Sequence, residues 1–317
     1  MFDLETIRPI AVCICTYRRP LQLQRLLNTL AVLERPAGTR FVIVNNDRDD
    51  EQTRVLVQNF RNACGAPVSY VVETRPGLSA ARNAAIGAAR AAGAGSVAWL
   101  DDDEWPSGQW LMKLIDVQQR TGAAVVGGPV CPVFESGEAP AAKYRSLWSV
   151  QKGRLRGLTY VYCTCNCLID LAAVAFLGDE PFSSAFGFTG GEDVVLFRRL
   201  YAAGIKMAWS DEAIVFEDIP GERATFAWLR RRWYRMGNIG VRCERAAPVG
   251  EPFRPLPKTL LLALRLVAYP LLHPRVFRMP RLWLLEAERI RGRLASHAGF
   301  VMMQYGRETA GQQQCAY

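Results

Sequence analysis

The chain has 317 residues, of which 50% are hydrophobic and 22% are charged, and its formal net charge is +9. This composition is typical of a globular protein and excludes an intrinsically disordered chain. No run of eighteen uncharged apolar residues occurs, so we expect no transmembrane helix. The acidic residues at the N-terminus also do not resemble a signal peptide.

Short apolar runs alternate with helical patterns over the first hundred residues. The expected strands are Ile10–Cys15, Phe41–Val44, Val68–Val72 and Val97–Leu100. The segments between them, 21–33, 51–61 and 78–93, have helical spacing. This alternation predicts an α/β fold built on a parallel sheet with right-handed crossovers.

Four consecutive carboxylates, Asp101–Glu104, follow the fourth expected strand. They repel one another, and a hard divalent cation bound to a phosphate would compensate their charge. The alternative is an acidic turn in which Asp103 or Glu104 starts the next helix. Polar residues also follow the other three strands, at Thr16–Arg19, Asn46–Asp47 and Arg75. Because ligands bind at the carboxyl ends of strands in open α/β sheets, we expect the functional site at this edge.

Several of these polar residues admit two interpretations. Asn46 and Asp47 either cap the next helix or contact a nucleobase or ribose, as an acid does after the second strand of nucleotide-binding sheets. Arg82 is either a solvated surface charge or, with Asn83 at the start of a helix, a contact for a diphosphate.

The second half of the sequence is less regular. We expect helices over 110–120 and 194–203, strands over 124–128, 160–169 and 213–216, and a loop over 182–191. The row Cys163, Cys165 and Cys167 fits one face of a strand and lacks the usual zinc spacing. We therefore expect reduced thiols in a core and a cytoplasmic location.

Asp193 lies directly after Gly190, Gly191 and Glu192 at the start of an expected helix. One interpretation is an acid at the helix N-terminus that stabilises the helix dipole. The other is a general base, because a helix N-terminus keeps a carboxylate ionised and the two glycines let it approach a substrate.

The C-terminal part of the chain is strongly basic. Residues 221–317 contain 17 Lys and Arg against 6 Asp and Glu, whereas residues 1–220 are slightly acidic. An amphipathic helix is expected over 223–242, with an apolar face of Phe226, Leu229, Trp233 and Met236. The leucine-rich segment 257–277 is too short and too broken to span a bilayer, but it suits an interfacial helix on anionic lipid. The alternative is a helical hairpin packed on the body.

Five motifs occur in an informative order: Cys15–Pro20, Val44–Asp47, Gly77–Asn83, Leu100–Glu104 and Gly191–Asp193. Together they resemble family 2 glycosyltransferases of the GT-A fold, over roughly residues 8–240. The resemblance implies a mixed, mostly parallel sheet flanked by helices. It also implies inverting transfer of a sugar from a nucleotide-diphosphate sugar to a saccharide or lipid-linked acceptor, in polysaccharide, glycolipid or cell-envelope biosynthesis.

The resemblance also assigns residues. It implies that the donor is contacted by Thr16, Tyr17, Arg19, Asp47, Arg75, Arg82, Asn83, Asp101 and Asp102. Asp101 and Asp103 match the family's D-x-D motif, which holds Mg²⁺ or Mn²⁺, and Asp193 matches the catalytic base. Where many relatives carry a metal-binding His, this chain has Glu217, which is either a further oxygen ligand or a loop cap.

These assignments predict a division of the chain and leave rivals open. We expect a glycosyltransferase domain at 1–245, with a nucleotide-sugar half at 1–125 and an acceptor half at 126–245, and a basic helical extension at 246–317. The protein is expected in the cytoplasm, peripheral on the inner face of the plasma membrane.

A nucleotidyltransferase on the same kind of sheet stays open as an alternative function because of Arg18 and Arg19. An anion- or nucleic-acid-binding module is disfavoured because aromatic and basic residues alternate poorly.

Overall fold

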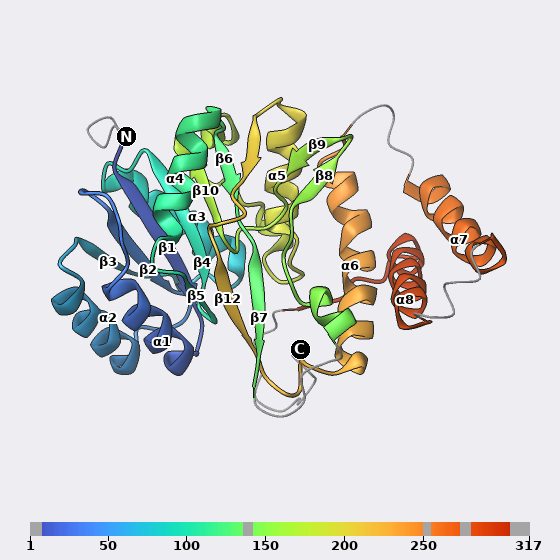
Figure 1. The fold of residues 1–317 in the computed structure, drawn as a ribbon, viewed down its shortest axis with the longest axis horizontal. Helices are drawn as coiled ribbons and strands as arrows, with labels where there is room; N and C mark the ends of the chain where they lie inside the picture. The colour runs from blue at the N-terminus through green and yellow to red at the C-terminus, as the bar shows by residue number, and fades with distance from the viewer. Residues whose placement is uncertain (1–7, 136–141, 250–254, 273–279, 305–317) are drawn as a thin grey trace.

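The computed structural model describes residues 8–135, 142–249, 255–272 and 280–304, which form one α/β body with helices added at one end (Figure 1). The central sheet has seven strands in the order β11, β6, β10, β4, β1, β2 and β3. Their bounds are Met207–Trp209, Val125–Gly127, Cys167–Asp170, Ser96–Asp101, Ile10–Thr16, Arg40–Asn45 and Val68–Val72. All neighbouring strands are parallel except β10, which is antiparallel to both β4 and β6.

Helices cover both faces of this sheet because successive side chains of its central strands are apolar and point alternately to the two faces. Ile10, Val12 and Ile14 of β1 pack into one core, together with α1 (Pro20–Ala31), α2 (Glu51–Cys64) and α4 (Trp110–Thr121). Ala11 and Cys13 pack into a second core, with α3 (Leu78–Ala91) and α5 (Glu192–Ala202). The predicted fold class, a mostly parallel sheet flanked by helices, is confirmed.

A second, three-stranded sheet adjoins the first at the acidic residues. It contains β5 (Glu104–Pro106), β12 (Val215–Ile219) and β7 (Val130–Phe134), with β12 in the middle. The chain passes from β4 to β5 through a turn of two residues, Asp102 and Asp103. The interpretation that Asp103 or Glu104 starts a helix is therefore wrong, because Glu104 pairs with Glu217 across the small sheet.

The expected strand 160–169 is also wrong. The chain forms a separate hairpin of β8 (Gly153–Leu155) and β9 (Leu158–Tyr160). It joins the central sheet again only at Cys167, where β10 begins. Asn166 breaks the run because its backbone is left-handed, with φ of 68°. Its buried side chain donates to the carbonyls of Pro129 and Ala213. Cys163 and Cys165 therefore lie outside any strand, and the described cysteines are free thiols.

Three single-turn or two-turn 3₁₀ segments complete the body. They are η2 (Ala142–Leu147), η3 (Leu171–Leu177) and η4 (Ser184–Phe186). The last lies inside the segment expected as a loop, and it precedes the glycines at the start of α5.

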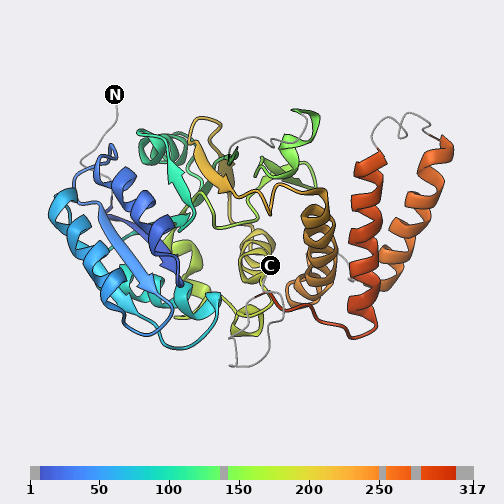
Figure 2. The same cartoon turned by 90° about the horizontal axis from the view of Figure 1, so that it is seen from below.

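Three helices follow the body: α6 (Phe226–Ala246), α7 (Pro255–Leu272) and α8 (Pro280–His297). Helix α8 packs along α6, and α7 lies on the outer side of α8 (Figures 1 and 2). The expected apolar face of α6 is wrong at Met236, which is exposed. Of the predicted segment 257–277, residues 273–277 lie outside the described ranges. None of the described helices is long and apolar enough to cross a membrane. The division at residue 245 stays a prediction.

Candidate functional site

A cavity of about 540 Å³ opens at the carboxyl ends of β1 and β4, where ligands were expected. One part of its lining is acidic, and it consists of Asp101, Asp102, Asp103, Glu104 and Glu217. Another part is basic, and it consists of Arg19, Arg223, Arg231, Arg232 and Arg235. The two charge types suit a ligand that carries both anionic groups and a bound cation.

The turn between β4 and β5 is held in place by Arg19. Asp102 is buried and accepts hydrogen bonds from Thr16 Oγ1 at 2.9 Å and Arg19 Nη1 at 3.0 Å. Asp103 accepts from the same Arg19 nitrogen at 3.0 Å and from Arg223 Nη1 at 3.3 Å. Burial raises the pKa of Asp102 despite these partners. Asp102 therefore positions the turn in addition to lining the cavity.

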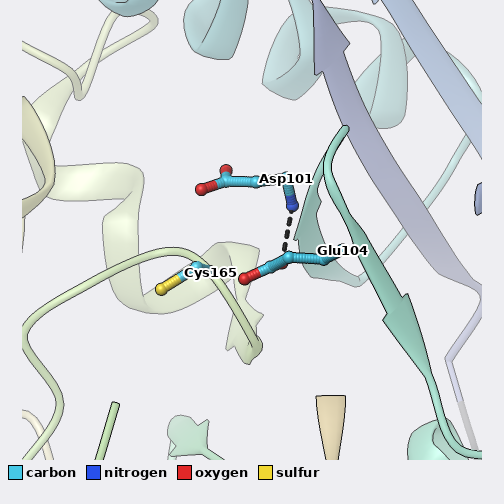
Figure 3. Close-up of side chains that lie close together, drawn as sticks. All are labelled: Asp101, Glu104 and Cys165. Atoms are coloured by element: carbon cyan, nitrogen blue, oxygen red, sulfur yellow. Dashed lines mark hydrogen bonds between the residues drawn. The ribbon is translucent and has the colours of Figure 1, made fainter. Parts of the chain in front are cut away.

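Asp101, Glu104 and Cys165 lie close together, and all three line the cavity (Figure 3). Glu104 is buried and its Oε2 accepts the backbone N–H of Asp101 at 2.8 Å, so it fixes the end of β4. Single ligand atoms of these three residues lie within 4.8 Å of one another. Burial raises the pKa of Asp101 and raises that of Glu104 well above its usual range. Sequence reasoning missed the role of Glu104, although its position three residues after Asp101 was visible.

Glu217 reaches the same cavity from β12. Burial and the neighbouring Asp103 raise its pKa to about 7, and Arg223 Nη1 lies 4.0 Å from its Oε1. The structure thus brings Asp101, Asp103 and Glu217 to one cavity. Burial raises the pKa values of Asp101 and Glu217, and a nearby cation stabilises such carboxylates in their ionised form. Carboxylate oxygens are the ligands that Mg²⁺ and Mn²⁺ prefer, so the type of donor fits such an ion, although the described acids whose ligand atoms converge within 4.8 Å are Asp101 and Glu104, beside Cys165.

Arg82 connects the acidic turn to the start of α5. It is buried, it forms an ion pair with the buried Glu192, and its Nη2 lies 3.4 Å from Asp101 Oδ1. The interpretation of Arg82 as a solvated charge is wrong, because the guanidinium is fully enclosed between these carboxylates. Arg82 is not among the residues that line the cavity, so its contact with the site runs through Asp101.

Asp193 lies in the first turn of α5, next to Glu192. The helix begins after Gly191, whose φ is 92°, and a Cβ there would lie 2.6 Å from Ile239 on α6. Asp193 is therefore not an N-cap, although it is an acid in the first turn. Its charge acts on Arg82 and Asp101, which places it beside the site, but it does not line the cavity in this structure.

The remaining predicted donor contacts divide into two groups. Thr16 and Tyr17 line the cavity as expected. Asp47, Arg75 and Asn83 do not line it.

Each of those three has a partner elsewhere. Asp47 accepts from Arg18 Nε at 2.5 Å, which lowers the pKa of Asp47. Arg75 pairs with Glu73 and Glu180 at 2.9 and 2.7 Å. Asn83 is buried and bonds both the N–H and the carbonyl of Phe182, so it holds the loop before α5.

Asn46 lines the cavity where Asp47 was expected. Its amide donates to the carbonyls of Glu73 and Arg75, so it joins two strand ends. It does not cap the next helix. Asp50 does so, because its side chain accepts the N–H of Thr53 at 2.7 Å.

Helix α6 supplies most of the basic lining. Trp228, Arg231, Arg232 and Arg235 occur at i, i+3, i+4 and i+7, which places them on one helix face. Arg232 also lies over the Trp228 ring, 5.1 Å from its centroid. Met302 and Gln304, which follow α8, complete this side.

Known proteins resemble this chain in sequence and in fold over most of its length. The model of glycosyl transferase family 2 matches residues 11–176. The succinoglycan biosynthesis protein ExoM of Rhizobium meliloti is 34% identical over 234 residues, which cover 74% of each chain. The glycosyltransferase AglE of Haloferax volcanii is 26% identical over 210 residues, covering 66% of this chain and 67% of AglE.

Two solved structures share the fold. The mannosyltransferase PcManGT from Pyrobaculum calidifontis, in complex with GDP-Man and Mn²⁺, superposes with a TM-score of 0.62 at 19% identity. The match covers 93% of this chain and 88% of that chain. TarS 1-349 of S. aureus in complex with UDP gives a TM-score of 0.51 at 14% identity, over 93% and 92% of the two chains.

Proposed function

Since this chain belongs to glycosyltransferase family 2, we propose that it transfers a sugar from a nucleotide-diphosphate sugar to a hydroxyl group of a saccharide or lipid-linked acceptor, with inversion at the anomeric carbon. The observation that carries the proposal is the cavity at the strand ends, with carboxylates on one side and the arginine face of α6 on the other. The name of ExoM supports a place in polysaccharide biosynthesis.

The nucleotide half of the donor belongs at the ends of β1 and β4. Thr16, Tyr17 and Asn46 supply polar and aromatic contacts there, and Arg19 adds a positive charge. Asp102 keeps Thr16 and Arg19 in position by accepting hydrogen bonds from both. The GDP-Man and UDP complexes of the two structural neighbours support a nucleotide donor in this fold.

The diphosphate belongs between the acidic turn and the arginines. Asp101, Asp103 and Glu217 would hold Mg²⁺ or Mn²⁺, which would neutralise the charge that develops on the departing diphosphate. Arg223 borders both Asp103 and Glu217, and so it is placed to contact the same anionic group. The Mn²⁺ in the PcManGT complex supports metal use but does not identify the ion here.

Asp193 is the proposed general base. Its carboxylate takes the proton of the acceptor hydroxyl, the hydroxyl oxygen bonds to the anomeric carbon, and the electron pair of the breaking C–O bond leaves with the diphosphate. Attack from the face opposite to the leaving group inverts the configuration. The ion pair of Arg82 with Glu192, the residue before Asp193, fixes the start of α5 next to Asp101. A glycosidase would instead need two paired carboxyl groups and no diphosphate site.

The rival functions gain no support from the site. Arg18 and Arg19, which kept a nucleotidyltransferase open, pair with Asp47 and with Asp102 and Asp103. The arginines of α6 line a cavity that five carboxylates also line, which disfavours the nucleic-acid-binding module. We also propose that residues 1–245 form the catalytic domain, and that the protein acts at the cytoplasmic face of a membrane.

A panel of nucleotide sugars tests the proposal, with nucleoside-diphosphate release and the anomeric configuration of the product as readouts. Asp193→Asn should bind the nucleotide normally and lose transfer, whereas Asp179→Asn, at an exposed carboxylate, should behave like the parent. Asp103→Ala should lose metal-dependent nucleotide binding in calorimetry. Normal turnover in Asp193→Asn would refute the base assignment, and a retained configuration would refute inversion.

A further inference from the structure

Helix α7 is the outermost element of the molecule, on the far side of α8 from the body (Figures 1 and 2). Its inner side packs on α8. Thr259 is fully buried and accepts a hydrogen bond from Arg293 Nε at 3.0 Å. The carbonyl of Leu266 accepts from Trp283 Nε1 at 3.1 Å. An amphipathic surface helix buries one side against the body of the protein, and α7 does so with this inner side.

The outer side of α7 is nevertheless apolar. Leu256, Leu260, Leu264 and Val267 follow one another at helical spacing, and Leu264 and Val267 are 66% and 68% exposed. Leu261 extends the same exposed surface. A helix that is apolar on both sides is normally covered on both sides, and contiguous exposed apolar surface marks an interaction site.

Side-chain contacts hold α7 against its neighbouring helices and so set the orientation of this outer face. Glu244 on α6 accepts from Arg293 on α8 at 2.8 Å and from Lys258 on α7 at 2.5 Å, which links all three helices. Helices α6 and α8 cross closely at Gly237 and Gly292, where a Cβ would overlap the facing backbone carbonyl. The exposed leucines are therefore carried by a helix that contacts both α6 and α8.

Positive charge borders the apolar face. Arg265 and Lys258, seven residues apart on α7, lie on the side adjoining the leucine stripe, and both are exposed. Arg291 on α8 is also exposed, and residues 221–317 carry the basic excess of the whole chain. Two copies of this chain that met through the face would bring these cations together, so charge disfavours a second copy as the occupant.

We propose that the outer face of α7, formed by Leu256, Leu260, Leu261, Leu264 and Val267, inserts into the interface of an anionic lipid bilayer, with Arg265 at the headgroups. Such a helix lies in the membrane plane with its apolar side among the acyl chains. This face is the surface that would bind the membrane at which the protein is proposed to act, so the inference rests on that part of the proposed function. It does not depend on the donor chemistry.

Vesicle flotation tests the proposal with the full-length protein. The probes are vesicles of phosphatidylglycerol mixed with phosphatidylcholine, and vesicles of phosphatidylcholine alone. The parent should float with the anionic vesicles and lose binding as salt is raised. The double variant Leu260→Glu/Leu264→Glu should bind roughly a hundredfold more weakly, because each inserted leucine contributes about tenfold. Leu21→Glu/Val32→Glu, at side chains near the two ends of α1 that are 75% and 83% exposed, is the matched control and should float like the parent.

Each other outcome overturns the proposal. Equal flotation of both double variants removes α7 as the docking face, and equal binding to neutral vesicles removes the role of charge. Light scattering that shows a dimer lost only in the α7 variant assigns the face to a second copy. Nucleotide binding by calorimetry and thermal unfolding check that the variant is folded, and Val267→Glu supplies a milder test if it is not. Failure of the donor chemistry would leave the flotation result unchanged, so the two proposals fail separately.

Discussion

Glu217→Gln should make the metal-free protein more stable at alkaline pH. Burial and Asp103 raise the pKa of Glu217 to about 7, against an ordinary value of 4.5. The folded state therefore binds this proton more tightly than the unfolded state, and stability falls as the pH rises between these two values. A difference of about 2.5 pH units corresponds to roughly 3 kcal/mol in the free energy of unfolding.

Urea unfolding in a chelating buffer from pH 5 to pH 8 measures this effect. Parent and variant should be nearly equal at pH 5, and the variant should be more stable by up to roughly 3 kcal/mol at pH 8. Mn²⁺ at a hundred times its dissociation constant should add about 2.7 kcal/mol to the parent and less to the variant. Glu135→Gln, at an exposed carboxylate, is the control. A difference that stays constant across the pH range would refute the assignment of Glu217 to a buried, negatively charged site.

Three further predictions concern the packing that supports the site. Gly292→Ala should lower the free energy of unfolding by about 2 kcal/mol or more, because a Cβ would overlap the carbonyl of Tyr234. The control Gly299→Ala has a positive φ but meets no neighbour, so it should lower the free energy of unfolding by less. Equal melting temperatures of the two variants would contradict this prediction. Arg82→Leu should cost about 3 kcal/mol or more in urea unfolding, because it leaves the carboxylate of Glu192 buried without its partner; an unchanged midpoint would show that the pair is not needed. Asn83→Ala should cost about 1–3 kcal/mol through the lost bonds to Phe182 while nucleotide affinity in calorimetry stays the same, and a selective loss of affinity would restore Asn83 as a donor contact.

The first hundred residues could be predicted from the sequence almost element by element. Strands such as Ile10–Thr16 are buried on both faces, so their composition is continuously apolar and unlike that of the helices between them. The strand β3 was expected at Val68–Val72 and is found there. The order of these elements follows from one rule, that parallel strands need crossover helices.

The small sheet could not be predicted because its partners are far apart in the chain. β5 has only three residues, and it is a strand because β12, more than a hundred residues later, pairs with it. The hairpin of β8 and β9 is equally short. The left-handed backbone at Asn166 gave no periodicity signal, since its cause is a set of carbonyls supplied by other segments. Short elements of this kind are fixed by tertiary contacts and not by local pattern.

The site shows the same division between residue type and residue role. The sequence placed the acids of the turn at one sheet edge, the family resemblance suggested Glu217 as a further ligand, and the structure brings them to one cavity. All four acids of the turn line the cavity, but the sequence did not show that Asp102 and Glu104 are buried and also hold a side chain or the backbone of the turn in position. That distinction depends on which carboxylate is buried against Thr16 or against the Asp101 amide. Four adjacent acids look alike in a sequence because their burial is decided by other parts of the fold.

The charges of the acidic turn also couple the strand ends of the central sheet to the segments that lead into α5 and α6. Arg19 from the β1 end and Arg223 from the segment before α6 both bind Asp103, while Arg82 joins Asp101 to the start of α5. A cation that binds Asp103 must therefore compete with two guanidinium groups. Its binding would weaken the contact of Arg223 with the turn and free that side chain for a phosphate group. The helix that carries the remaining arginines begins directly after Thr225, so a change at Asp103 acts on the basic side of the cavity through a connection of only a few residues.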